Sequence, residues 1–91
     1  MDNKKIEKIS KALSDTNRLA ILQQLKKKKN CLYCSEVNDF LDLTQPSVSH
    51  HLKQLVDAEL LISEKEGRNI RYQLNQKVLD DYIASLTRFI N

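Results

Sequence analysis

The sequence predicts a single, mainly helical α+β domain. Its 91 residues suffice for one hydrophobic core, and one glycine and one proline leave little room for long irregular loops. Apolar side chains recur at helical spacing along most of the chain, whereas after Leu60 they alternate with polar ones, as in strands. These observations favour several helices packed around one small β-hairpin.

Two helices are predicted in the N-terminal part. Residues 3–13 carry three apolar side chains at helical spacing. A second helix follows to about residue 28, with Ser14 or Asp15 as the cap whose side-chain oxygen accepts from free N–H groups of the first turn. Residues 30–33 break the helical pattern, and a short extra strand fits there.

A helix-turn-helix is predicted next. Ser35 opens a short helix that ends at Leu43, and Thr44 caps a longer one. Pro46 falls in the first turn of the longer helix, where its missing N–H costs nothing. A short helix, a turn and a second helix with a polar cap together form the outline of this motif.

A hairpin and a last helix complete the chain. Residues 61–75 are interpreted as two strands joined by a loop at residues 66–69, where Gly67 supplies the positive φ that such turns often need. The last helix covers about residues 76–89. The order α-α-α-α-β-β-α describes a winged helix-turn-helix, which we expect to span residues 1–91 as one domain.

Composition and charge restrict the class of function. The formal net charge is +3, which permits a polyanionic partner without requiring one. Residues 26–29, four lysines, are interpreted as the solvated end of the second helix, with phosphate contact as the alternative. No signal segment or membrane-length apolar run is present, so we expect a cytoplasmic protein with no membrane partner. An enzyme is not expected, because no glycine-rich loop or paired-carboxylate site is evident.

Three stretches resemble the ArsR/SmtB (arsenic-repressor) family of winged-helix repressors. The family's second-helix signature is similar to KALSDTNRLAILQQL, its recognition-helix signature to LTQPSVSHHLKQLVDAELL, and its wing to EKEGRNIRYQLN. The stretches occur in the family's order and cover most of the chain. The resemblance implies a homodimeric transcriptional repressor that leaves DNA when an inducer binds.

The second helix of the predicted motif has the outward face that a DNA-reading helix needs. Val48, Leu52 and Leu55 point inward on a helical wheel, and small polar side chains point outward. No acidic side chain occurs in residues 44–56, and Gln and Ser can hydrogen-bond to base edges. The basic wing suits phosphate or minor-groove contact. The predicted DNA-binding residues are Gln45, Ser47, Ser49, His50 and Lys53 in the helix and Lys65, Arg68 and Asn69 in the wing.

Two positions need a separate interpretation. His51 flanks the apolar stripe, so we expect it to be packed and hydrogen-bonded. Zinc binding by the two histidines is disfavoured, because adjacent residues point in different directions on a helix. Glu59 stands where the family usually has glycine. The helix therefore either ends at Glu59 in a left-handed conformation or continues by one residue.

Cys31 and Cys34 leave three alternatives open. They are ordinary reduced cysteines, a reversible disulfide that alters DNA affinity, or ligands of a thiophilic metal ion completed by other groups. Metal-sensing relatives often carry a CVCDL element here, whereas CLYCSEV is shifted and incomplete, and the last helix lacks the histidines of zinc-sensing relatives. No cofactor is therefore required.

The first and last helices predict self-association. Their apolar stripes exceed what so small a core can cover from both sides, so we expect a homodimer that binds an imperfect palindrome in double-stranded DNA. The alternative for the stripes is that they pack on the chain's own core. The alternative function is a winged helix that contacts other proteins and has lost DNA binding. The predicted dimer residues are Ile6, Ile9, Leu13, Leu79, Tyr82, Ile83, Leu86 and Ile90.

Overall fold

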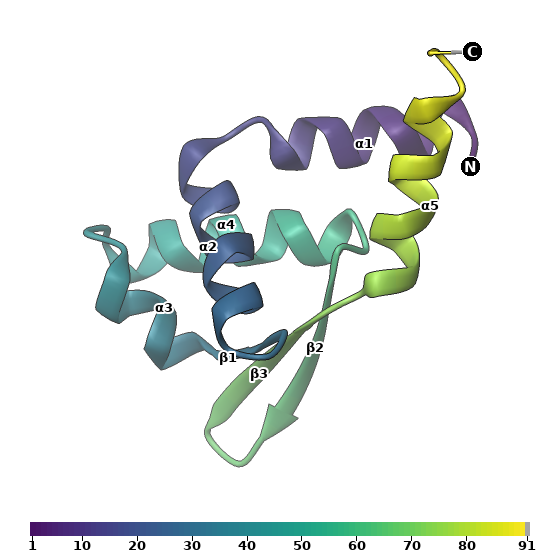
Figure 1. Ribbon diagram of the computed structural model, residues 1–91. Coiled ribbons are helices and arrows are strands. Elements are labelled where there is room, and N and C mark those ends of the chain that lie inside the picture. The colour runs from purple at the N-terminus through teal and green to yellow at the C-terminus, as the bar shows by residue number, and fades with distance from the viewer. Residues whose placement is uncertain (91) are drawn as a thin grey trace.

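The computed structural model describes residues 1–90 and has the predicted winged helix-turn-helix architecture, including the short extra strand (Figure 1). Both described ends of the chain lie where α5 meets the start of α1. Within residues 1–90 no helix combines the length and apolar character needed to cross a membrane. The elements are α1 (Asn3–Leu13), α2 (Thr16–Lys27), β1 (Cys31–Tyr33), α3 (Cys34–Phe40), α4 (Gln45–Asp57), β2 (Leu61–Glu66), β3 (Asn69–Leu74) and α5 (Gln76–Thr87).

Side-chain caps decide where most of the helices begin. Of the two predicted caps of α2, Asp15 is the one that accepts from first-turn N–H groups. The predicted cap of α4 is also confirmed: the Thr44 hydroxyl oxygen accepts from the N–H of Ser47 at 3.4 Å, and Pro46 lies in the first turn. Such a cap contributes about 1 kcal/mol. The residues that cap α1, α2, α4 and α5 in this way are Asp2, Asp15, Thr44 and Asn75.

The predicted bounds of α3 are wrong at both ends. The helix begins at Cys34 rather than Ser35, and the N–H of Tyr33, which precedes it, donates to the Glu36 carboxylate at 3.0 Å. It ends at Phe40, because Leu41 takes an extended conformation and buries its side chain in the core. Apolar spacing continues past this point to Leu43, so periodicity gave no sign of the end.

The three strands form one antiparallel sheet in the order β1-β3-β2. Leu32 of β1 lies opposite Tyr72 of β3, and both side chains are buried. The hairpin turn is tighter than predicted, because Glu66 and Asn69 form the last strand pair. Gly67 has φ +60°, which confirms the predicted need for glycine at the tip.

The core lies where α4 packs against the other helices and the sheet. The stripe of Val48, Leu52 and Leu55 is buried as predicted, each side chain being no more than 1% exposed. Full burial of a side chain of this size contributes about 2 kcal/mol. Other apolar side chains that are almost completely buried are Ile9, Ile21, Leu25, Leu32, Val37, Leu60 and Leu61.

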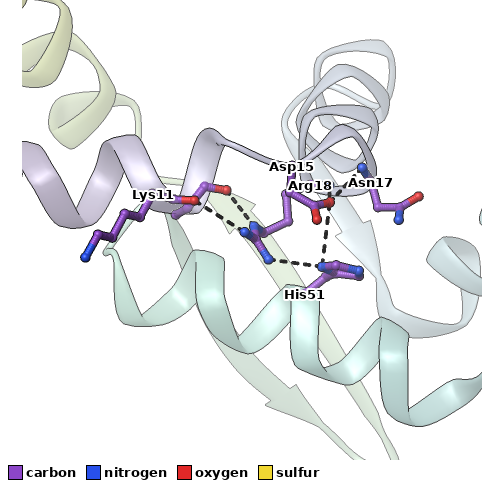
Figure 2. A network of polar contacts seen from close by, with 6 residues as sticks. Lys11, Asp15, Asn17, Arg18 and His51 are labelled. Carbon is purple, nitrogen blue, oxygen red and sulfur yellow. Dashed lines mark hydrogen bonds and ion pairs between the residues drawn. The ribbon is translucent and has the colours of Figure 1, made fainter.

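Arg18 of α2 joins three segments of the chain (Figure 2). Its Nε donates to the carbonyl of Ala12 at 2.6 Å and its Nη2 to that of Lys11 at 3.3 Å, at the end of α1. Its Nη1 lies 3.2 Å from Nδ1 of His51 in α4. Because a guanidinium only donates, this His51 nitrogen accepts. The predicted packed, hydrogen-bonded role of His51 is confirmed.

Asp15 supports the same junction from the start of α2. Its Oδ1 accepts from the N–H groups of Asn17 at 2.8 Å and Arg18 at 3.1 Å, and lies 3.9 Å from Nδ1 of His51. Burial alone would raise the pKa of the Asp15 carboxyl, but the hydrogen bonds from the two N–H groups and the neighbouring Arg18 charge together lower it. The carboxylate therefore stays ionised where it holds the first turn of α2.

Glu59 ends α4 in the left-handed conformation, the first of the two predicted alternatives. Its φ is +64°, and the N–H of Leu60 donates back to the carbonyl of Leu55 at 3.0 Å. For a residue with a side chain this conformation costs about 1 kcal/mol. The Glu59 carboxylate also pairs with the Lys5 ammonium at 2.6 Å, and this hydrogen bond lowers the pKa of Glu59 and raises that of Lys5.

Candidate nucleic-acid interface

The outward face of α4 is polar and carries no acidic side chain over its first twelve residues. Ser49, His50 and Lys53 are exposed on the side opposite the buried stripe. The short helix α3 and a turn precede α4, so the pair forms the predicted helix-turn-helix. The apolar stripe fixes which face of α4 is buried. The opposite face is free to enter the major groove of DNA, which is wide enough to admit a helix.

A groove joins the start of α4 to the wing, the β2–β3 hairpin. It has a volume of about 340 Å³. Gln45 and Ser49 enter it from α4, and Arg68 and Asn69 enter it from the tip of the wing. Four of the eight predicted DNA-binding residues, from two separate segments, are therefore brought together. The remaining lining residues are Cys34, Ser35, Asn38, Ile70 and Tyr72.

The other four predicted residues lie outside this groove. His50, Lys53 and Lys65 are exposed to solvent. Ser47 is half-buried, and its hydroxyl oxygen accepts from the Thr44 hydroxyl at 3.0 Å. The Ser47 hydroxyl can keep this hydrogen bond and still donate its own proton to a base.

Side chains of α3 hold the first residue of α4 in place. The Asn38 amide donates to Oε1 of Gln45 at 2.7 Å, and Nε2 of Gln45 lies 3.8 Å from the Cys34 sulfur. The sequence prediction missed Asn38 and Ser35. For Asn38 the available signal was its spacing from Cys34, since residues i and i+4 share one face of a helix; Ser35 had no such signal. Gln45 is consequently oriented before any ligand arrives.

The arginines of the wing differ in their electrostatic environment. Arg71 lies 2.7 Å from Glu64 and 3.4 Å from Glu66, and the hydrogen bond that its guanidinium donates to Glu64 raises its pKa. The Tyr33 hydroxyl donates to Glu66 at 2.9 Å, which raises the pKa of this tyrosine. Arg68, by contrast, is exposed in the groove and forms no ion pair within residues 1–90. Its charge is available to a phosphate.

The two cysteines lie on different sides of the sheet. Both thiols are free and half-buried. Cys34 lines the groove beside Tyr72, whereas Cys31 alternates with the buried Leu32 and so points to the outer face of β1. No three His, Cys, Asp or Glu side chains of residues 1–90 gather closely enough to hold a metal ion. In this arrangement the two thiols do not form one site.

The predicted dimer residues fall into three groups. Ile9 is 0% exposed and Tyr82 is 8% exposed, with its hydroxyl 2.8 Å from that of Ser10. These two residues belong to the core of one chain, which corrects their prediction as interface residues. Ile83 and Ile90 are exposed, as is Phe89, which was not among the predicted residues and is 77% exposed. The half-buried members are Ile6, Leu13, Leu79 and Leu86.

Known proteins similar to this chain are transcription regulators. A family described as a helix-turn-helix domain matches residues 13–64. The arsenical resistance operon repressor of Staphylococcus aureus is 43% identical over 86 residues, covering 94% of this chain and 81% of that protein. The transcriptional repressor SdpR of Bacillus subtilis is 36% identical over 83 residues, covering 91% of this chain and 90% of that protein.

Solved structures resemble the fold over nearly the whole chain. An ArsR-like transcriptional regulator from Rhodococcus sp. RHA1 superposes with a TM-score of 0.80 at 28% identity, covering 94% of this chain and 79% of that one. HlyU from Vibrio cholerae superposes with a TM-score of 0.74 at 29% identity, covering 98% and 97%. The likeness includes both the helix-turn-helix and the wing, because it extends over almost every described element.

The difference between Arg68 and Arg71 can be measured through the salt dependence of DNA binding. We expect Arg68→Ala to reduce the slope of log affinity against log salt by about one unit per bound subunit, because each subunit loses one phosphate contact. Arg71→Ala is the matched control, and we expect its slope to equal that of the wild type. Equal slopes for all three proteins would exclude Arg68 as a phosphate contact.

Proposed function

This chain belongs to the ArsR/SmtB family of winged helix-turn-helix, DNA-binding transcriptional repressors, and we propose that it acts as a homodimer on an imperfect palindromic operator. The observation that carries the proposal is the groove in which the start of α4 meets the tip of the wing. In this proposal the chain works as one DNA-binding domain, with α1 and α5 as its dimerisation helices. A purely protein-binding role has no comparable observation in its favour.

The proposed docking places the N-terminal half of α4 in the major groove. Gln45, Ser49 and His50 then face base edges, where an amide can bond twice to adenine and a hydroxyl can bond to either kind of edge. Lys53 lies one turn further along α4 and meets the phosphate backbone. The wing adds Lys65, Arg68 and Asn69 as phosphate or minor-groove contacts.

The proposed dimer uses the exposed apolar surface of α5 and of the turn that follows it. Ile83 is 50% exposed, Phe89 77% and Ile90 82%, and α1 contributes the half-buried Ile6 and Leu13 beside the same core. Exposed apolar side chains on so small a domain suit a self-complementary interface. A two-fold axis there would present two α4 helices to half-sites about 10 base pairs apart or a multiple of that spacing.

Base reading by α4 is tested by Ser49→Ala. We expect a roughly thirty-fold loss of affinity for the operator, because one hydrogen bond of about 1 kcal/mol is removed in each of the two half-sites, and no change in affinity for unrelated DNA. Fluorescence anisotropy with DNA from upstream of the protein's own gene measures both. Ser14→Ala, an exposed serine between α1 and α2, is the control. An equal loss on both DNAs would remove Ser49 from the base-reading set.

The dimer is tested by two single substitutions, each of an isoleucine with the same exposed fraction. Ile83→Ser should weaken dimerisation about ten-fold in sedimentation equilibrium, since both subunits lose an apolar contact. Ile62→Ser, in the wing, should leave dimerisation unchanged; both isoleucines are 50% exposed. A wild-type chain that stays monomeric at micromolar concentration, or two variants with the same effect, would contradict the proposed interface.

We also propose that thiol chemistry releases the repressor. The Cys34 sulfur lies in the groove beside Nε2 of Gln45, so a change at this sulfur reaches the recognition helix directly. If a peroxide oxidises Cys31 and Cys34 to a disulfide, the two thiols give up two protons and two electrons and the peroxide is reduced to water. Because the two thiols lie on different sides of the sheet, closing this disulfide requires the backbone between β1 and α3 to move, and the movement would draw Cys34 away from Gln45. A thiophilic metal ion is the alternative and needs further ligands, because two thiolates do not complete a tetrahedral site.

The thiol proposal predicts how reduced and oxidised proteins bind DNA. We expect peroxide treatment to weaken operator binding of the wild type about ten-fold, within the usual range of coupling between two sites. If the disulfide forms, Cys31→Ser and Cys34→Ser both abolish this effect; if the change occurs at Cys34 alone, only Cys34→Ser does. Two results together would show that the cysteines are not the switch. Operator binding would be unchanged after both thiols have been oxidised, and it would also be unchanged after addition of arsenite or zinc.

A further inference from the structure

A second hollow lies between the end of α2 and the start of α5. It has a volume of about 370 Å³, within the range of small-molecule sites, and shares no residue with the groove at the recognition helix. Leu22 enters it from α2, Leu74 from the end of β3 and Leu79 from α5. The remaining lining residues are Lys26, Lys29, Asn30 and Gln76.

The hollow combines an apolar lining with unpaired positive charge. None of its lining residues is acidic. The four-lysine run at residues 26–29 divides here: Lys28 pairs with Glu36 at 3.4 Å, whereas Lys26 and Lys29 line the hollow and form no ion pair within residues 1–90. Three leucine side chains and two free ammonium groups match the two ends of an amphipathic anion.

The backbone at the rim is strained. Lys29 and Asn30 are consecutive residues with φ +58° and +66°, and neither is glycine. Each costs about 1 kcal/mol in the left-handed region, and such residues concentrate at ligand sites. Hydrogen bonds from the N–H of Asn30 to Leu25, and from the N–H of Leu74 to Asn30, hold the turn. This turn brings Lys29 and Asn30 to the hollow.

We propose that this hollow binds a small organic carboxylate with an apolar body. The carboxylate lies between the ammonium groups of Lys26 and Lys29, near the positive end of α5, and the apolar body lies on Leu22, Leu74 and Leu79. Such a ligand contacts α2 and α5 together. Its binding therefore involves α5, the helix that we assign to dimerisation. The site goes beyond the proposed repressor function, and its binding can be measured without DNA.

The experiment is a titration of the full-length protein with 4-phenylbutyrate, followed by ¹H–¹⁵N NMR. We expect saturable shifts of the amides of Leu22, Asn30 and Leu79, and weaker binding of the uncharged analogue 4-phenylbutanol. The double variant Lys26→Gln, Lys29→Gln should bind the carboxylate about five-fold more weakly, as expected for partly exposed ion pairs. Lys27→Gln, from the same run but outside the hollow, should bind like the wild type.

Three outcomes would overturn the proposal. The first is the absence of saturable shifts at these amides, and the second is equal binding of the acid and the alcohol. The third is a double variant that binds the carboxylate normally and has a lower salt slope for DNA. That result would assign Lys26 and Lys29 to phosphate contact instead. If the wild-type protein does not bind the operator, that result contradicts the proposed repressor function but not this ligand site.

Discussion

The position of the recognition helix depends on the Arg18 guanidinium, which bonds to the last carbonyls of α1 and to His51 in the middle of α4. The apolar stripe of α4 decides which face is buried, but hydrophobic contact alone is not directional. Hydrogen bonds to a charged group add direction, because their strength falls when donor and acceptor lose alignment. A helix held in this way can present Ser49 and His50 at one fixed angle.

Local features of the sequence predicted most of the elements, whereas contacts between distant residues escaped it. Thr44, Pro46 and Gly67 act within their own turns, so their roles could be inferred from spacing. Arg18 and His51 are 33 residues apart, and their pairing requires the packed fold. The sequence predicted that His51 would be hydrogen-bonded. Its partner could not be predicted, because that pairing exists only in the packed fold.

The candidate site was predicted in part for the same reason. Exposed positions of α4 and the wing followed from helical and strand periodicity. That Asn38 holds Gln45 could not be inferred, because it depends on how α3 and α4 cross. The stripes of α1 and α5 were also ambiguous: Ile9 and Tyr82 are buried within one chain, whereas Ile83 is exposed. Residues of the same type likewise differ in their charged neighbours. Arg68 and Arg71 each add one positive charge to the composition, but the sequence does not reveal which of them forms ion pairs.

The shortest strand has a consequence for the sheet as a whole. β1 has three residues, and Leu32 is the one whose side chain is buried. Because strand side chains alternate, sliding β1 by one position along β3 would turn Leu32 outward and Cys31 inward. The burial of Leu32 therefore fixes the register of β1 against β3. Helix α3 begins at the residue that directly follows β1. The burial of one side chain thus fixes the side of the sheet to which the Cys31 thiol points.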